Sequence, residues 1–184
     1  HEASDHGFSS AMFDAGALPY DQNLRRTTSA AQWAHTHGLW LEAELGYVGG
    51  KPDAPASAHA AGVRTDPAEA AAFVAATGVD ALAVAVGSSH AMAQLTAVLD
   101  DDLIARLRAA LPVPLVLHGS SGVPADGLRH AVTAGITKIN IGTALNLAFT
   151  GAVRETITDG HDPRHYLAAA REAVADAVAS LLAG

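Results

Sequence analysis

The feature that most constrains the fold is a regular alternation of short apolar runs with longer segments of helical character. The apolar runs are SSAMFD (9–14), LWLEAELG (39–46), ALAVAVG (81–87), PLVLHG (114–119) and TKINIG (137–142). Short, nearly continuous apolar runs are typical of strands that are buried on both faces of a parallel sheet. The alternation therefore predicts an α/β fold, with a parallel sheet and helices packed outside it.

Helices are expected between and after these strands, at 21–37, 67–77, 100–111, 125–134, 144–158 and 163–182. Asp66-Pro67 and Asp162-Pro163 each place a capping residue before a proline at the first helical position. Five βα units are too few for a closed eight-stranded barrel, which needs about 250 residues, but they fit the last five units of one. An open, doubly wound sheet is the alternative.

One segment departs from this alternation. KPDAPASAHAAGV (51–63) is rich in Pro, Ala and Gly and has no core pattern. A structureless loop of this length inside a compact domain is usually functional. We therefore predict a mobile active-site loop at 51–63 within a single domain that covers 1–184.

Charge and composition narrow the possible partners. Eleven basic and 19 acidic residues give a formal charge of −8, which argues against a nucleic-acid partner or an anionic membrane surface. The absence of cysteine leaves imidazole and carboxylate as metal ligands. No apolar run approaches the roughly 20 residues that cross a bilayer, and no signal peptide is visible. These features favour a cytoplasmic location.

The candidate catalytic residues lie where the apolar runs stop, because the carboxyl ends of parallel strands share one edge of the sheet. His90 and His118 each follow an apolar run closely. Two imidazoles, a third ligand and an open position form a Lewis-acid site for zinc or a similar divalent ion. The alternative is that each histidine caps its strand through a backbone hydrogen bond.

Carboxylates supply further candidates. Glu42 and Glu44 alternate within one strand, so both point to the same side of the sheet, where burial requires a metal or a basic partner. A structural ion pair with Arg or Lys is the alternative. Asp53, on the predicted loop, is a candidate for proton transfer, although a solvated loop aspartate has the same sequence signature.

Two loops of small residues are candidate anion sites. Gly119-Ser120-Ser121-Gly122 and Asn140-Ile141-Gly142-Thr143 each lead into the start of a predicted helix. Backbone amides at a helix start can bind a phosphate group. Ordinary turns have the same composition, so one such loop is weak evidence. The prediction of a phosphate site rests on the occurrence of two such loops after neighbouring strands.

Several longer strings resemble one family. They are MFDAGALPYDQN (12–23), LEAELGYVGG (41–50), RTDPAEAAAFVAATGVDALAVAVGSSH (64–90), PLVLHGSSGVP (114–124), GITKINIGTALNLAFTGAVR (135–154) and DPRHYLAAAR (162–171). Together these strings resemble class II, metal-dependent fructose-bisphosphate and tagatose-bisphosphate aldolases. The resemblance implies a TIM barrel, of which this chain supplies about the last five βα units.

The resemblance also implies roles for individual residues. His90 and His118 match two of the three zinc histidines, and Glu44 matches a nearby carboxylate that can contact the metal. The residues that match positions around the ketose phosphate are Gly119, Ser121, Asn140, Gly142 and Thr143. The implied reaction is the reversible cleavage of a ketose bisphosphate to dihydroxyacetone phosphate and an aldehyde. A monovalent cation, Na⁺ or K⁺, and a homodimer or homotetramer are implied as well.

Departures from the family pattern bear on activity and specificity. The family's His-x-Asp-His motif, with the third metal histidine and the catalytic aspartate, is expected before His1. His90 is followed by Ala91 where the family has glycine, and Asp53 is the only loop acid. The string from Asn140 to Asn146 lacks the aspartate and the arginine of typical fructose-bisphosphate enzymes, which favours a tagatose-like or other ketose. The alternatives are another sugar-phosphate lyase or epimerase, and a catalytically degenerate homologue that binds sugar phosphates.

Overall fold

A computed structural model describes residues 2–46, 48, 64–157 and 161–183 of the chain. The predicted loop at 51–63 and its candidate acid Asp53 lie outside the described residues. The strands are β1 (Ser10–Phe13), β2 (Trp40–Leu45), β3 (Ala81–Val84), β4 (Leu115–Leu117) and β5 (Ile136–Ile139). The helices are α1 (Tyr20–Thr36), α2 (Pro67–Thr77), α3 (Asp101–Ala110), α4 (Ala125–Ala134), α5 (Thr143–Thr156) and α6 (Pro163–Ala183), with a short 3₁₀ turn η1 (Ser120–Gly122).

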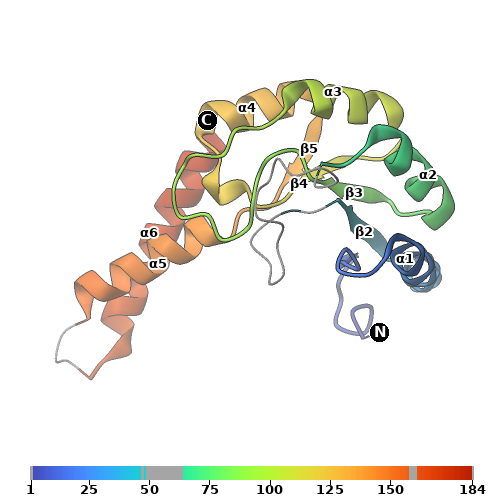
Figure 1. Cartoon of the computed structure of the whole chain (residues 1–184). Coiled ribbons are helices and arrows are strands. Elements are labelled where there is room, and N and C mark those ends of the chain that lie inside the picture. The colour runs from blue at the N-terminus through green and yellow to red at the C-terminus, as the bar shows by residue number, and fades with distance from the viewer. Residues whose placement is uncertain (1, 47, 49–63, 158–160, 184) are drawn as a thin grey trace.

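The strands form one parallel sheet in the consecutive order β1-β2-β3-β4-β5. Each crossover moves one position in the same direction, so right-handed connections place the four crossover helices, α1 to α4, on the same side of the sheet. Helices α1 to α4 form an arc around this outer side in Figure 1. A doubly wound sheet would instead reverse its strand order at a switch point. The architecture therefore confirms part of a TIM barrel and excludes the open alternative.

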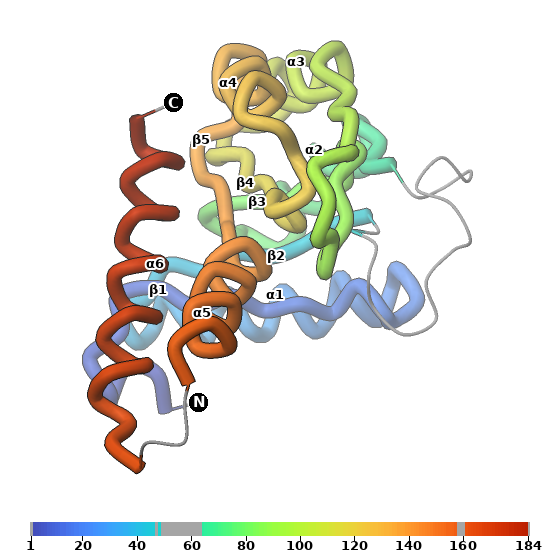
Figure 2. Tube along the Cα trace, turned by 90° about the vertical axis from the view of Figure 1, so that its left-hand side faces the viewer, coloured from blue at the N-terminus to red at the C-terminus, as the bar shows by residue number. Residues whose placement is uncertain are grey.

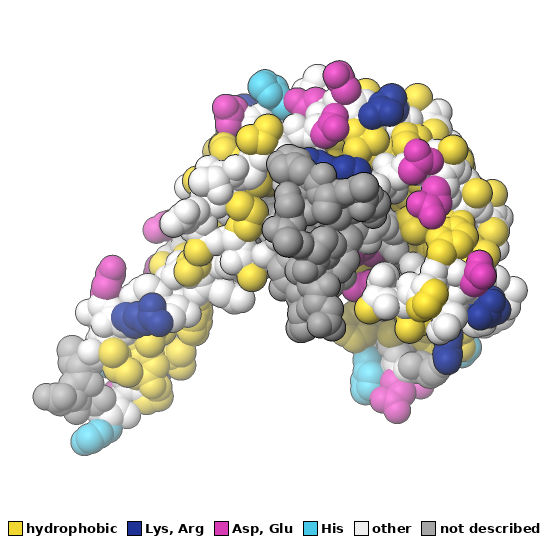
Figure 3. Space-filling view, viewed as in Figure 1, with side chains coloured by type: hydrophobic (Ala, Val, Ile, Leu, Met, Phe, Trp, Pro, Cys, Tyr) yellow, Lys and Arg dark blue, Asp and Glu magenta, His cyan; other side chains and the backbone are white. Residues whose placement is uncertain are grey.

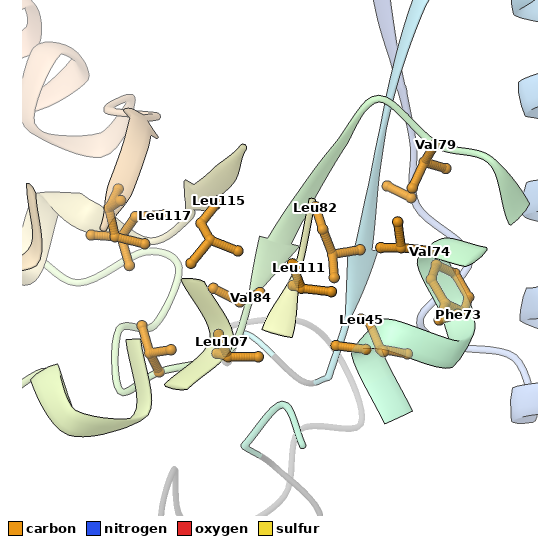
Figure 4. Close-up of a cluster of buried hydrophobic side chains, with 14 of the residues drawn as sticks. Leu45, Phe73, Val74, Val79, Leu82, Val84, Leu107, Leu111, Leu115 and Leu117 are labelled. Carbon is orange, nitrogen blue, oxygen red and sulfur yellow. The ribbon is translucent and has the colours of Figure 1, made fainter. Parts of the chain in front are cut away.

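The main hydrophobic core lies between the outer face of the sheet and the helices. Alternate residues of the strands point outward into this layer and meet side chains of α2 and α3, as Figure 4 shows for part of the cluster. Its fully or nearly fully buried members include Leu41, Leu45, Leu82, Val84, Leu115, Leu117, Phe73, Ile104 and Leu107. The inner face of the sheet carries a smaller cluster of Ala81, Ala83 and Val116, together with the polar residues described below.

The predicted elements are all present, and the strands are shorter than their apolar runs. Strands β2, β3 and β4 are buried along almost their whole length, as expected. The expectation of burial on both faces is wrong for β1 and β5, where exposed and half-buried residues predominate. These two strands are the edges of the described sheet, and each has a single neighbour to cover it.

Helices α5 and α6 form a hairpin that projects from the sheet. The two helices pack mainly against each other and lie side by side in Figures 1 and 2. Only Ala170 of the pair is fully buried, and Figure 3 shows hydrophobic side chains gathered on the hairpin. Its exposed large hydrophobic residues are Leu147, Phe149, Ile157, Leu167, Val178, Leu181 and Leu182. Within the described part of the chain, no helix combines the length and apolarity that a membrane crossing requires.

Candidate metal centre and anion-binding loops

A cavity of about 420 Å³ opens at the carboxyl ends of the strands. All five strands or the loops that follow them contribute to its wall. The contributing residues are Met12 on β1 and Asp14 after it, Glu44 on β2, Ser89 to Ala91 after β3, His118 to Ser121 after β4, and Asn140 to Thr143 after β5. The structure therefore brings together, at the strand ends, candidate residues that lie up to 99 positions apart in the chain, from Glu44 to Thr143.

His118 lies at the centre of a buried polar network on the inner face. Its Nδ1 lies 2.8 Å from Glu44 Oε2, and its Nε2 lies 2.9 Å from Glu42 Oε1. Both glutamates come from β2 and are buried, so they do point to the same side as predicted. Burial disfavours the charged imidazole, but the hydrogen bonds and charges of the two glutamates outweigh burial and raise the pKa of His118 to about 9.

Glu42 links this network to β5. Its Oε2 accepts a hydrogen bond of 2.7 Å from the Lys138 ammonium group, while Oε1 faces His118. Burial opposes the charge on Glu42, but the contacts with His118 and Lys138 prevail and hold the pKa of this carboxyl below its usual value. The sequence left open whether Glu42 contacts a metal or forms a structural ion pair with a basic residue. The geometry supports the ion pair.

His90 lies beside His118 on the cavity wall. The two ring centroids are 5.8 Å apart, and the planes are inclined by 53°. One potential ligand atom from each of Glu44, His90 and His118 lies within 4.8 Å of the others. Zinc bonds of about 2.0–2.2 Å hold tetrahedral ligand atoms roughly 3.4 Å apart, so small side-chain movements would suffice. Two imidazoles and a carboxylate fit zinc or a similar divalent ion.

The loops that carry the two histidines pack directly on each other. The Ser88 hydroxyl donates a hydrogen bond of 2.6 Å to the backbone carbonyl of His118. Gly119 has a φ of +64°, and a Cβ atom there would lie 2.5 Å from the backbone carbon of Ser89 and 2.9 Å from the amide nitrogen of His90. A glycine after His118 is therefore required both by the left-handed backbone and by the close approach of the His90 loop.

The two small-residue loops also meet at this cavity. Helix α5 begins at Thr143 after an N-cap glycine that offers no side-chain cap, and Ser121 Oγ accepts a hydrogen bond of 3.0 Å from the Ala144 amide. The candidate anion-binding residues that line the cavity are Gly119, Ser121, Asn140, Gly142 and Thr143. All the described candidates for metal and phosphate binding thus face one cavity.

Two further residues of this wall were not among the predicted site residues, although Ala91 was noted as a departure from a family glycine. Asp14 lines the cavity, and its Oδ1 accepts a hydrogen bond of 2.9 Å from the Gly16 amide. Its position at the end of an apolar run was the available signal. Ala91 adopts a φ of +59°, and it is the only non-glycine residue with a positive φ in the described ranges. The replacement of a family glycine at this position was the corresponding signal.

Comparisons with known proteins agree with this geometry. The family profile described as "Fructose-bisphosphate aldolase class-II" matches residues 1–183. The structure is similar to the crystal structure of the YdjI aldolase from Escherichia coli K12, with 38% sequence identity and a TM-score of 0.80 over 96% of this chain and 61% of that chain. A putative fructose-1,6-biphosphate aldolase from Coccidioides immitis is 29% identical, with a TM-score of 0.81 over 97% of this chain and 65% of that chain.

A third solved structure, a fructose-bisphosphate aldolase from Campylobacter jejuni, supports the fold alone. It is 23% identical, with a TM-score of 0.74 over 96% of this chain and 61% of that chain. The present chain thus spans 61–65% of the length of these relatives.

Proposed function

The chain belongs to the class II fructose-bisphosphate aldolase family, and from this premise we propose that the protein is a metal-dependent aldolase. The proposed reaction is the reversible cleavage of a ketose bisphosphate, similar to fructose or tagatose 1,6-bisphosphate, into dihydroxyacetone phosphate and an aldehyde. The single observation that carries the proposal is the convergence of Glu44, His90 and His118 on the same cavity as two loops suited to anions.

His90 and His118 are the proposed metal-binding residues, and Glu44 is a carboxylate that can join or leave the metal. When bound, zinc or another divalent ion supplies Lewis-acid polarisation of the substrate ketone. Burial of His118 and Glu44 supports this role, because a dry site strengthens the electrostatic interactions inside it. The third histidine and the catalytic aspartate are expected on residues before His1.

The proposed phosphate site consists of Gly119, Ser121, Asn140, Gly142 and Thr143. Its location at the start of α5, where the N-cap glycine has no side chain to cap the helix, supports it, because the first amides of a helix attract an anion. A monovalent cation, Na⁺ or K⁺, is proposed to assist near the phosphate, and Asp53 is proposed as a loop acid. The absence of the family's aspartate and arginine between Asn140 and Asn146 favours a tagatose-like or other ketose over fructose 1,6-bisphosphate.

The test uses the protein expressed with the natural sequence that precedes His1. Metal-free enzyme is reconstituted with Zn²⁺, and dihydroxyacetone phosphate is measured with each candidate ketose bisphosphate. We expect cleavage that disappears with a chelator, returns with Zn²⁺ and is lost in His90→Ala. The exposed His130 provides the matched control, so His130→Ala is expected to keep full activity.

The alternatives give different outcomes in the same assay. Turnover of a sugar phosphate without dihydroxyacetone phosphate would favour another lyase or an epimerase. Metal and sugar-phosphate binding without any turnover would favour a catalytically degenerate homologue, an alternative that the left-handed Ala91 beside His90 supports.

A further inference from the structure

His118 offers two ring nitrogens, and a metal ion in the cavity can take only one of them. In the described structure, both nitrogens contact carboxylates, with Glu44 on the Nδ1 side and Glu42 on the Nε2 side. Because the two glutamates are separated by one residue in an extended strand, they hold the ring from two sides. The role of each glutamate therefore depends on which nitrogen faces the metal.

The surroundings of the two glutamates differ. Glu44 lines the active-site cavity and belongs to the group of potential ligands with His90. Glu42 lines a separate hollow deeper on the inner face, together with Val116 and Lys138, and does not line the active-site cavity. The Nδ1 edge of the ring thus faces the active-site cavity, and the Nε2 edge faces the separate hollow that Glu42 lines.

We propose that His118 binds the metal through Nδ1, and that Glu42, fixed by Lys138, is a positioning residue that accepts a hydrogen bond from the Nε2–H group. The proposal rests on the metal-dependent function proposed above. In this proposal Glu42 and Lys138 position the imidazole of His118. Glu44, two residues from Glu42 in the same strand, instead faces the metal.

The chemistry of imidazole supports this division. A neutral imidazole carries one N–H group, and a carboxylate that accepts a hydrogen bond from it fixes the tautomer and makes the other nitrogen a better ligand. Lys138 occupies Oε2 of Glu42 at 2.7 Å, which leaves Oε1 directed at Nε2. The Lys138 ammonium group also balances a carboxylate that is only 8% exposed.

The first measurement is zinc affinity, obtained by competition with a chromophoric chelator. In Glu42→Gln, an amide group replaces the carboxylate. Its NH₂ group must face either the Lys138 ammonium group or the Nε2–H group of His118, and two donors that face each other form no hydrogen bond. We expect zinc to bind 10- to 100-fold more weakly, the range seen when outer carboxylates of metal histidines are removed. Lys138→Met is expected to weaken zinc binding as well, while Lys138→Arg retains a cation and stays within about threefold of the wild type.

Asp80→Asn is the matched control. Asp80 contacts His35 Nε2 at 2.9 Å near the opposite end of β2, in a histidine–carboxylate pair of the same length as that of Glu42 and His118. This variant tests for a general loss of stability and is expected to bind zinc as the wild type does. Comparison of Lys138→Met with Lys138→Arg keeps the proposal testable even if Glu42→Gln does not fold.

The second measurement is the tautomer of His118 in the zinc-loaded protein, from long-range ¹H–¹⁵N correlation spectra. We expect a proton on Nε2 and zinc on Nδ1, a signature that a purely structural role of Glu42 would not determine. Zinc on Nε2, or unchanged zinc affinity in both Glu42→Gln and Lys138→Met, would overturn the inference and leave the proposed function intact. A wild-type protein that binds neither zinc nor any other divalent ion would overturn both.

Discussion

At the scale of single residues, Gly119 connects the two candidate metal histidines. It follows His118 directly, and the loop of His90 lies against the space where a side chain would be. The family strings indicated a glycine here, but not its physical reason, because contacts between separate loops leave no periodic signal in a sequence. Ala91 shows the converse case, in which a side chain is present at a backbone conformation that favours glycine.

We expect Gly119→Ala to lower both stability and zinc affinity. The left-handed backbone costs about 1 kcal/mol with alanine, and a Cβ at 2.5 Å from the Ser89 backbone adds about 1–3 kcal/mol and displaces His90. Urea denaturation and chelator competition measure the two effects. Gly78→Ala is the control, because Gly78 has a φ of +69° with open space around its Cβ position, so it should lose about 1 kcal/mol and keep its zinc affinity. Equal losses in both variants would contradict the close-packing argument.

We expect Ala91→Gly to raise stability by roughly 0.5 kcal/mol. Relief of the left-handed strain, about 1–2 kcal/mol, exceeds the added entropy of glycine in the unfolded chain, about 0.5–1 kcal/mol. Ala93, two residues further on, has no positive φ. In Ala93→Gly no left-handed strain is relieved, and only the added conformational entropy of the unfolded chain changes the stability. This variant is therefore expected to be less stable than the wild type. The opposite signs of the two changes in urea midpoints form the test, and a loss of stability in both would refute it.

At the scale of elements, capping residues made the helices more predictable than the strands. Helix α2 has the predicted bounds, because Asp66 and Pro67 mark its start and Gly78, with left-handed φ, marks its end. Helix α4 also has the predicted bounds. Strands carry no comparable end signals, and the paired part of β4 is shorter than its apolar run of 114–119. The partial burial of β1 and β5 depends on neighbours in space, which a local pattern does not encode.

The Asp66 cap gives a prediction at this scale. Its Oδ1 accepts hydrogen bonds from the amides of Ala68 and Glu69, both at 2.9 Å. Asp66→Ala is expected to reduce the free energy of unfolding by about 1 kcal/mol, since two amides of the first turn lose their acceptor. Asp66→Asn retains an acceptor and should stay within a few tenths of a kcal/mol of the wild type. Identical stability of the alanine and asparagine variants in urea would show that the cap contributes nothing.

At the scale of the whole molecule, the sequence predicted the fold class and the gathering of site residues, but not the polar network between them. The order of apolar runs and helices was sufficient for a parallel, barrel-like sheet, and strand ends located His90, His118 and Glu44. The contact of Lys138 with Glu42 was not predicted, because it joins residues 96 positions apart across the inner face. Lys138 lies within a short strand of mixed burial, where a lysine has many ordinary explanations.

This network predicts how the metal-free protein responds to pH. The pKa of His118 rises from its ordinary value of 6.5 to about 9. The contribution of His118 to the free energy of unfolding is therefore fully present below pH 6.5 and is lost as the pH rises through 9. The pKa of Glu42 is lowered, so the contribution of Glu42 is present above its ordinary value and is lost at acid pH. Unfolding in urea at pH 6, 7.5 and 9.5 should show falling stability, by up to about 3 kcal/mol. His118→Asn should remove most of this slope, and a wild-type slope in that variant would contradict the assignment.

The consecutive order of the strands has a consequence for how the molecule folds. Each strand pairs with the strand that precedes it in the sequence. The sheet can therefore form one strand at a time, and each step closes only the loop between two consecutive strands. The contacts of His118 with β2 and of Lys138 with Glu42 close loops of 74, 76 and 96 residues. We expect these polar contacts to form last, after the strands that carry them are in register. Metal binding by Glu44, His90 and His118 would then report that β2, β3 and β4 have come into register.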